Sequence, residues 1–481
     1  MAPGGGRIDV LQWPVVGPFL RWRHTRTAIQ LVLLLAAVLV VIDGLLGSRV
    51  DPTSFTTVLT WVHYRGLLVV ALLAAGNLFC TGCPFVLARD AGRRIHASNL
   101  TLPRWLRTKW IGVALFAAVL FCYELFDLWA LPRATALLVL AYFASALLID
   151  LVFRGASFCK YFCPIGQFNF IASTMSPLEL RVRDAGVCGT CRTVDCIKGN
   201  DLQRGCELRL FLPAKVGNLD CTLCLDCVHA CPHDNIALAA RVPGAELADA
   251  RRRSGIGRLT RRRDIAALVV LFVFGSLMNA FGMVAPVRGV ESAIAQAMGI
   301  QSEAPALAVL FVAVLVVAPL VLLGLAATLA GMFAGDSAPS PAGRSFQGRM
   351  QIAVSYVYAL VPFGFGMWLA HYGFHLLTGA FTIVPVTQRA AVDVLGWPAL
   401  GEPLWRLTGM RPGSVFPIQV GLILLGTLGS LAAAFQISDR DYPRRQAAAF
   451  IPWAILIMLL AGAALWILSQ PMDMRGLGAL G

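Results

Sequence analysis

The residues most able to do chemistry in this chain are its thirteen cysteines, all of which lie between Cys80 and Cys231. Thiolates bind iron–sulfur clusters, zinc and copper(I), and cysteines also pair as disulfides. A secreted disulfide scaffold would not confine its cysteines to one stretch of a chain that is 58% hydrophobic. Their close spacing near arginine-rich segments therefore indicates metal ligation in a reducing compartment.

The most specific motif is CTLCLDCVHACP, at residues 221–232. Its spacing, C-x2-C-x2-C-x3-C-P, is that of bacterial two-cluster ferredoxins, in which the fourth cysteine ligates the neighbouring cluster. A zinc site would use four ligands and leave the proline unexplained. The motif therefore predicts one iron–sulfur cluster and requires a second set of cysteines.

A second set precedes this motif with the less regular spacing C-x2-C-x4-C-x9-C, and glutamate rather than proline follows its last cysteine. Because such motifs exchange their fourth cysteines, two [4Fe–4S] clusters with mixed ligands are predicted. The first has the ligands Cys188, Cys191, Cys196 and Cys231. The second has the ligands Cys221, Cys224, Cys227 and Cys206.

A duplicated motif lies upstream, as GNLFCTGCPF (76–85) and GASFCKYFCPI (155–165). Each copy follows an apolar run, and its proline is expected to end that membrane span in a turn, because proline cannot continue a helix without losing a hydrogen bond. The soft thiolates are predicted to share a third iron–sulfur centre or a copper ion. Dithiol redox exchange and a purely structural role are the alternatives. The four cysteines are Cys80, Cys83, Cys159 and Cys163.

Three histidines are expected near the outer membrane face. His371 and His375 are one helical turn apart, and His63 begins an earlier span. Ionisable groups at membrane depth are functional candidates. The possibilities are a quinone or proton site, a haem b site that pairs one of them with His63, another metal site, or hydrogen-bonded interfacial histidines. The neighbouring Arg65 is expected to extend to the interface.

Long apolar runs position these residues. Such runs must be helices, because lipid offers backbone groups no hydrogen-bond partner. The predicted fold class is an all-α polytopic membrane protein with an inserted small α+β, ferredoxin-like 2[4Fe–4S] segment. About nine transmembrane helices are expected, near residues 28–47, 60–80, 110–131, 134–155, 264–284, 305–333, 351–381, 416–437 and 449–470.

The arginines between spans predict the orientation. They gather in loops that would share one side of the membrane, which the positive-inside rule assigns to the cytoplasm. These loops also account for the net charge of +14, so no nucleic-acid partner is expected. The predicted domains are a cytoplasmic N-terminal segment (1–27), a four-helix membrane region (28–176), a cytoplasmic ferredoxin-like domain with a basic linker (177–263), a five-helix membrane region (264–470) and an outside C-terminal tail (471–481).

Taken together, the paired Cys–Pro motifs and the double-cluster segment resemble those of the membrane-bound bacterial polyferredoxins. This family includes the subunits that accompany periplasmic nitrate reductase and nitrous-oxide reductase, and it is related to assembly ferredoxins of haem–copper oxidases. The resemblance covers roughly residues 55–240. The chain departs from the family in its second half, where about five further spans have no counterpart.

The resemblance implies electron transfer in a bacterial inner membrane, between a quinone pool or cytoplasmic donor and an outside acceptor, with protein redox partners in a respiratory complex. The chain shows no nucleophile or general-base constellation, so an electron-transfer subunit fits better than a self-contained enzyme. Two other functions remain open. One is a copper-reducing assembly factor, and the other is a redox or iron sensor.

Overall fold

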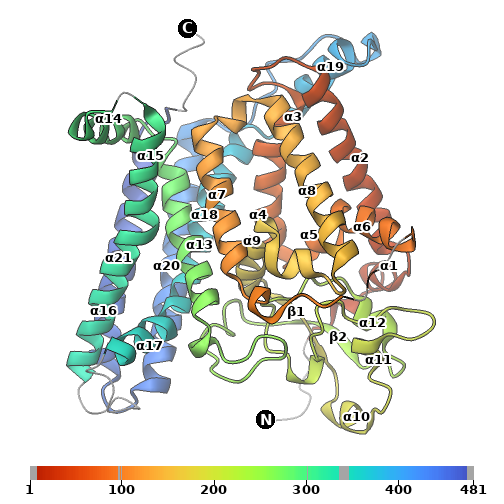
Figure 1. Ribbon diagram of the computed structural model, residues 1–481, viewed down its shortest axis with the longest axis vertical. Helices are drawn as coiled ribbons and strands as arrows, with labels where there is room; N and C mark the ends of the chain where they lie inside the picture. Colours follow the sequence, from red (N-terminus) through yellow and green to blue (C-terminus); the bar gives the residue numbers. More distant parts are fainter. Residues whose placement is uncertain (1–7, 96–97, 99, 301, 335–345, 474–481) are drawn as a thin grey trace. The chain divides into compact units, whose positions relative to one another are not determined.

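The computed structural model describes residues 8–95, 98, 100–300, 302–334 and 346–473, and helices dominate it (Figure 1). Residues 1–7 and 474–481, which belong to the two predicted terminal segments, lie outside the described residues.

Within the described residues, eight helices are long and apolar enough to cross a membrane. The chain is thus mostly helical and of the multi-pass type, as predicted. Their bounds are Thr25–Leu46 (α2), Phe55–Ala75 (α3 to α4), Pro132–Val152 (α8), Arg263–Phe281 (α13), Glu303–Ala334 (α15 to α16), Gln347–Thr378 (α17 to α18), Pro412–Asp441 (α20) and Gln446–Ser469 (α21).

The remaining predicted span is shorter than expected. Its helix α7 covers Trp110–Leu125, 16 residues in all. At 1.5 Å per residue such a helix is about 24 Å long, less than the ~30 Å of a hydrocarbon core. A separate 3₁₀ turn, Leu128–Ala130, follows it, because Asp127 adopts a left-handed conformation that interrupts the helix.

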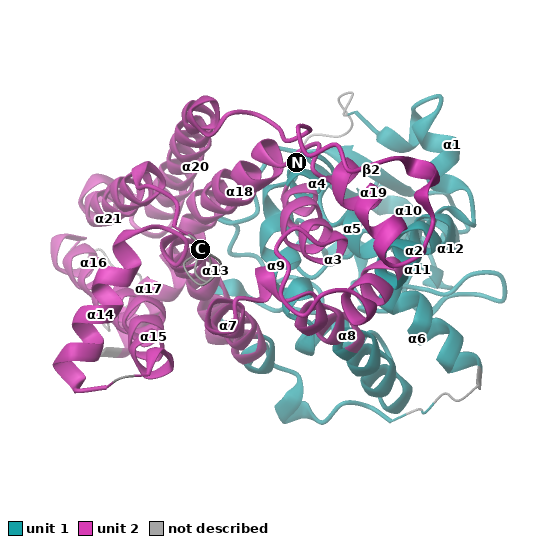
Figure 2. Cartoon of the chain, turned by 90° about the horizontal axis from the view of Figure 1, so that it is seen from above, with its two compact units in different colours: residues 1–38, 70–112, 141–262 teal, residues 39–69, 113–140, 263–481 magenta. Residues whose placement is uncertain are grey.

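The chain forms two compact units, each assembled from separated stretches (Figure 2). Unit 1 comprises residues 1–38, 70–112 and 141–262, and unit 2 comprises residues 39–69, 113–140 and 263–481. Every cysteine except Cys122 lies in unit 1. The cysteines predicted to bind metal are therefore confined to a single unit, whereas the candidate histidines His63, His371 and His375 lie in unit 2.

A small antiparallel sheet closes the cysteine-rich segment of unit 1. Strand β1, Leu178–Val182, pairs with β2, Ile236–Ala240, so that the segment between them begins and ends side by side. Short helices lie in between: α10 (Ala185–Thr190), α11 (Asp195–Lys198) and α12 (Asp226–Ala230). Apolar side chains fill the interior of this segment, including those of Leu180, Leu208, Leu210, Leu212, Ile236 and Leu238.

An N-terminal strap, residues 8–22, lies against the same sheet. Asp9 forms an isolated bridge with Ala239, and its carboxylate accepts a hydrogen bond from the backbone of Leu238 at 3.1 Å. Farther along, the strap contains helix α1, Val16–Arg21, and Arg21 forms an ion pair with Asp234 at 2.8 Å. The strap therefore joins the start of the chain to the end of the cysteine-rich segment.

The duplicated motif has the same local structure in both copies. Each copy begins with a glycine in the left-handed region, Gly76 (φ 69°) or Gly155 (φ 83°), where a side chain would be strained. A short helical turn carries the first cysteine, Leu78–Thr81 (α5) in one copy and the π-helical Phe158–Phe162 in the other.

The prolines of this motif do not end the spans, and the prediction that they would was wrong. Pro84 and Pro164 are the first residues of the helices α6 (Pro84–Ile95) and α9 (Pro164–Ala172). Proline suits the first helical position, where its missing N–H has no partner to lose. The Sγ of Cys163 instead caps α9, because it accepts a hydrogen bond from the backbone of Gly166 at 3.2 Å.

Unit 2 is built around closely packed long helices. Helix α18 (Val361–Thr378) packs against α20 and α13, and α21 packs against α16 (Ala318–Ala334) and α20. A side chain at Gly366 or Gly426 would approach backbone oxygen of the facing helix to 2.7 Å, so glycine permits the close contact of α18 and α20. Shorter helices complete the unit: α14 (Pro286–Met298), α17 (Phe346–Tyr356) and α19 (Ile383–Asp393).

Candidate functional site

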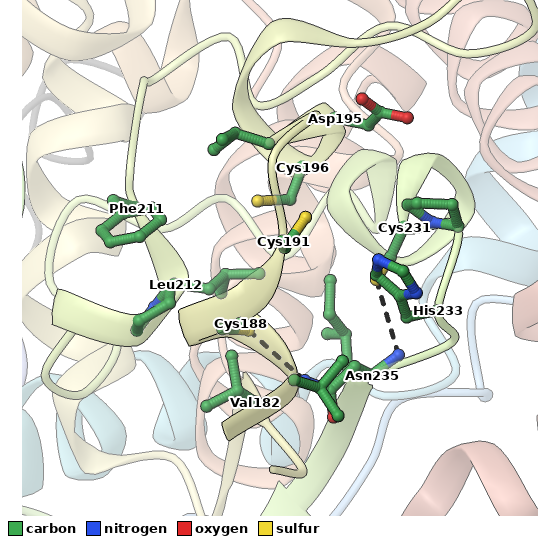
Figure 3. A pocket seen from close by; sticks show the side chains of 15 residues that line it. Val182, Cys188, Cys191, Asp195, Cys196, Phe211, Leu212, Cys231, His233 and Asn235 are labelled. Carbon is green, nitrogen blue, oxygen red and sulfur yellow. Dashed lines mark hydrogen bonds between the residues drawn. The ribbon is translucent and has the colours of Figure 1, made fainter. Parts of the chain in front are cut away.

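The first cysteine cavity brings together four cysteines from distant positions, which Figure 3 shows facing a common space. Three come from the irregular set and the fourth from the end of the downstream motif. Val182 and Ile236, at the paired ends of β1 and β2, also line this cavity, so the sheet positions its two sides. The cysteines that line it are Cys188, Cys191, Cys196 and Cys231.

Asn235 orients two of these thiols. Its side-chain Nδ2 donates to the Sγ of Cys188 at 3.3 Å, and its backbone N–H points at the Sγ of Cys231 at 3.5 Å. Between the other two cysteines, Val194 has a φ of 55°. A left-handed β-branched residue is strained, and such strain persists only where the surroundings enforce it. The chain is thus bent so that its sulfurs face the cavity.

The thiols of this cavity influence one another. Burial and the neighbouring thiols of Cys231 and Cys188 raise the pKa of Cys196 to about 11. The pKa of the partly exposed Cys191 is instead lowered by hydrogen bonds from the Val194 backbone and the Thr193 hydroxyl. Because thiolates repel each other, a group of four ionises together most readily around a positive centre.

The second cysteine cavity lies among the leucines of the segment and is more deeply buried. Burial raises the pKa of Cys224 and Cys227 well above the ordinary value. Leu223 and Leu225, which alternate with these cysteines, both have positive φ, at 51° and 63°. The same left-handed bending therefore occurs in both cavities. The cysteines that line this one are Cys206, Cys221, Cys224 and Cys227.

Neither cavity resembles a site for a single metal ion. Over the described ranges, no three or more histidine, cysteine, aspartate or glutamate side chains converge as ligands of one ion would. A [4Fe–4S] cube binds each thiolate at a different iron, so its ligands surround a volume instead of meeting at a point. Four cysteines around each cavity are the donor set that such a cube requires.

The membrane-edge thiols, Cys80, Cys83, Cys159 and Cys163, form a third group. Burial, and after it the neighbouring thiol of Cys83, raise the pKa of Cys80 to about 12. Burial, Cys83 and Cys80 likewise raise the pKa of Cys163. The two copies of the motif are thus close enough for their thiols to interact. Asn169 on α9 donates to the Sγ of Cys80 at 3.3 Å, which links the copies directly.

This third group adjoins the second cavity. The side chain of Asn77 donates to the carbonyl of Cys221 at 3.1 Å. The hydroxyl of Thr81, next to Cys80, donates to the carbonyl of Leu223 at 2.9 Å. Both contacts join the first Cys–Pro copy to the loop that carries the second cavity, so the two thiol groups lie in one connected site.

Buried ion pairs hold that loop, and no sequence pattern predicts them. Lys109 contacts Asp220 at 2.6 Å, directly before Cys221. Arg89 on α6 contacts Glu207 at 2.8 Å, directly after Cys206, and lowers the pKa of that carboxyl to about 2 even though burial opposes the shift. In the sequence, Arg89 and Lys109 are recognisable only as basic residues between two apolar runs.

A third pair has the same arrangement. Arg26, in the first turn of α2, contacts Asp226 at 3.0 Å, and Asp226 lies between Cys224 and Cys227. The carboxylates beside the second cavity are therefore each matched by a cation from a different part of unit 1: the start of α2, helix α6, or the residue before α7.

The histidines of unit 2 are placed differently from one another. Both ring nitrogens of His63 face backbone carbonyls, those of Val58 at 3.2 Å and Ala380 at 3.4 Å. The Nε2 atoms of His371 and His375 have no hydrogen-bond partner among the residues that the structure describes. The haem, quinone and metal alternatives for these histidines stay predictions.

Arg65 does not extend to a membrane interface, and that expectation was wrong. Its side chain is 9% exposed, and its guanidinium group lies over the rings of Trp61, Tyr123 and Tyr372 at 4.6–5.0 Å. It also donates to the hydroxyl of Tyr123 at 2.8 Å. Three aromatic rings within unit 2 thus stabilise the guanidinium charge, which its hydropathy alone would predict to be in contact with water.

Comparisons with known proteins find partial similarities. The chain is 27% identical over 197 residues to the "Putative electron transport protein YccM" of Escherichia coli K12, a match that covers 34% of this chain and 53% of YccM. It is also 28% identical over 102 residues to the uncharacterized protein MJ0749 of Methanocaldococcus jannaschii, covering 21% of this chain and 38% of that protein.

These similarities are partial. The chain spans about half the length of YccM and less of MJ0749. No protein-family model matches the chain, and no solved structure matches it. The chain is therefore similar, over a third of its length, to a protein named for electron transport, and it has the apolar helices of a membrane protein.

Proposed function

We propose that the protein is an integral-membrane iron–sulfur electron carrier. The observation that supports this most is the sorting of eight cysteines into two cavities of four, each of which exchanges a cysteine with the other motif. In this proposal each cavity holds one [4Fe–4S] cluster, which supplies one-electron redox chemistry. The segment around them is then a small α+β, ferredoxin-like unit.

The chain's own residues set the properties of these centres. Hydrogen bonds to sulfur, such as those from Asn235, stabilise thiolate charge, and nearby cations favour the reduced state. The second cavity lies among buried leucines and beside several ion pairs, whereas Cys191 in the first is partly exposed. The two centres would therefore differ in potential, which favours a directed transfer.

The third thiol group extends the proposal to the membrane edge. Its four cysteines would hold a further iron–sulfur centre, placed beside the second cavity by Asn77 and Thr81. Electrons would pass between the cytoplasmic clusters and a membrane or outer partner, such as a quinone pool, a haem or a periplasmic enzyme. In this proposal the cysteine-rich segment lies in the cytoplasm and the C-terminus outside, as the positive-inside rule predicts.

Copper handling is the second candidate function. Buried soft thiols at a membrane edge suit copper(I), and two motif copies provide four of them. In that case the protein would reduce and deliver copper to another metalloenzyme. A redox or iron sensor, in contrast, would require only the two iron–sulfur clusters and no metal at the membrane-edge thiols.

Anaerobic purification of the full chain, followed by iron and sulfide analysis and EPR, tests the carrier. Two [4Fe–4S] clusters predict about eight irons per chain. Cys224→Ser is expected to abolish one EPR signal and Cys188→Ser the other. Cys122→Ser, which alters a cysteine outside both cavities, should change neither. A protein purified without iron sinks the proposal.

The same preparation separates the two candidates. A third iron–sulfur signal that disappears in the Cys80→Ser/Cys159→Ser variant would support the carrier. Copper bound in a one-to-one ratio, and lost in that variant while two clusters remain, would support the assembly factor instead.

A further inference from the structure

A cavity of about 330 Å³ opens in unit 2, at the end where α13, α18 and α21 finish and α20 begins. Its volume falls at the lower end of the range for small-molecule sites. Most of its lining is apolar, and two aromatic rings, those of Phe374 and Phe416, belong to it. The cavity lies wholly within this unit and contains no cysteine.

Four polar side chains line this largely apolar cavity, those of His371, Gln419, Ser469 and Gln470, and the first two belong to the helices α18 and α20. His371 is 3% exposed, and its Nε2 has no hydrogen-bond partner among the described residues. Gln419 uses its Nε2 to donate to the carbonyl of Ala370 at 3.1 Å, which leaves its side-chain oxygen as an acceptor. Burying an unpaired imidazole nitrogen is costly, so the arrangement fits a ligand that supplies the missing partner.

We propose that this cavity binds the ring of a quinone or hydroquinone. The imidazole of His371 can donate to a quinone carbonyl or accept from a hydroquinone hydroxyl, according to its tautomer. The oxygen of Gln419 can accept from a hydroxyl of the reduced ring. Phe374 and Phe416 offer flat apolar surfaces for the ring itself.

Other ligands fit the cavity less well. A stable metal site needs several strong donors, whereas this lining offers a single imidazole beside two amides and one hydroxyl, and His375 does not line the cavity. An acyl chain would fill the apolar part but would leave the nitrogen of His371 unpaired. The inference rests on the proposed function for the role of the quinone as a redox partner, whereas its binding is tested independently.

Binding of decylubiquinone to the full chain in detergent, measured by isothermal titration calorimetry, provides the test. Saturable binding is expected in the wild type. His371→Leu should weaken it at least tenfold, and His371→Gln, which retains a donor nitrogen, should recover part of the affinity. The control is Gln446→Leu, a polar side chain at the start of α21 that does not line the cavity, and this variant should bind within twofold of the wild type.

Three outcomes would overturn the inference. They are the absence of saturable binding, equal losses in the His371→Leu and Gln446→Leu variants, and decylbenzene binding as tightly as decylubiquinone, which would indicate an alkyl site. Circular dichroism of each variant verifies that it is folded. Iron analysis of the same samples separates the quinone-site inference from the proposed iron–sulfur carrier. Clusters without quinone binding would overturn only the quinone site. Quinone binding without clusters would overturn only the iron–sulfur carrier.

Discussion

At the scale of single residues, the site is organised by buried charge. Three carboxylates adjacent in sequence to second-cavity cysteines, Glu207, Asp220 and Asp226, are each paired with a cation. An ion pair of this kind adds little net stability, but removing one partner leaves an uncompensated charge. These pairs therefore act mainly by fixing the position of the cysteine loop against the apolar helices.

Lys109 offers the clearest test of this role. Lys109→Met leaves the 2%-exposed Asp220 without its cation, and we expect a loss of about 3–5 kcal/mol in the free energy of unfolding. Denaturant titration followed by circular dichroism measures this loss. Lys198→Met, at an exposed lysine of the same unit, should change stability by less than about 0.5 kcal/mol.

The double variant Lys109→Met/Asp220→Asn should regain part of the loss, because no charge then remains buried. Equal stability of Lys109→Met and the wild type would contradict the role assigned to this pair.

Glu246 predicts a dependence on pH. Burial alone would raise its pKa, but Arg241 and Arg253 hold the pKa below its ordinary value. The folded carboxyl thus binds protons less readily than the unfolded one, and its stabilisation is complete above the unfolded pKa of about 4.3. It is lost as the pH falls through the lower folded pKa.

Thermal unfolding of the wild type and Glu246→Gln between pH 7 and 3.5 tests this. The wild type should unfold at the higher temperature at pH 7, and the gap should narrow below about pH 4.3. A gap that is constant over the whole range would show that the carboxyl charge is irrelevant.

At the scale of elements, the N-terminal strap stabilises the sheet that closes the cysteine-rich segment. Asp9 accepts from the backbone of Leu238, on β2, and forms an ion pair with Arg183 at 2.9 Å. Without that carboxylate the edge of β2 would lose an acceptor for one of its amides. The strap thus protects a strand that leads directly from Cys231.

Asp9→Ala is expected to increase amide hydrogen exchange in β2 by several-fold, most strongly at Leu238, because the amide loses its partner. Hydrogen-exchange mass spectrometry of the full chain measures this change. Asp9→Asn keeps a side-chain oxygen and should retain most of the protection at Leu238. Equal exchange in all three proteins would mean that the strap does not hold the strand.

Element prediction succeeded where one physical signal dominates. Apolar length identified the membrane helices, since few other structures use 18 or more such residues. The Cys–Pro motifs were misjudged because proline both ends helices and begins them, and the sequence did not show that the helix had already ended before Gly76 and Gly155. Local spacing alone does not distinguish these two uses.

At the scale of the whole molecule, the arginine-rich loops predict orientation. A reporter that is active only outside the cytoplasm, such as alkaline phosphatase, should be active when fused after residue 481 and inactive when fused after residue 252. The expectation follows from the positive-inside rule. The reverse pattern would place the cysteine-rich segment outside and remove the reducing compartment on which its chemistry depends.

The grouping of the predicted cysteines could be derived from the spacing of their motifs. The residues that hold these cysteines in place could not. The exchange of fourth cysteines anticipated which cysteines face each cavity, although the cluster assignment itself remains a prediction. The cage around Arg65 and the partner of Lys109 depend on contacts between residues more than 50 positions apart. No periodicity or spacing encodes such contacts, because they arise only when distant helices pack.

The exchange of cysteines between the two cavities has a consequence for biogenesis. During synthesis the irregular set emerges first, yet its cavity lacks a member until Cys231 leaves the ribosome, and the other cavity is completed only at Cys227. Both are thus completed within a few residues of each other. A nascent chain interrupted before this point would have neither cavity complete. Both cavities are therefore completed together, late in synthesis.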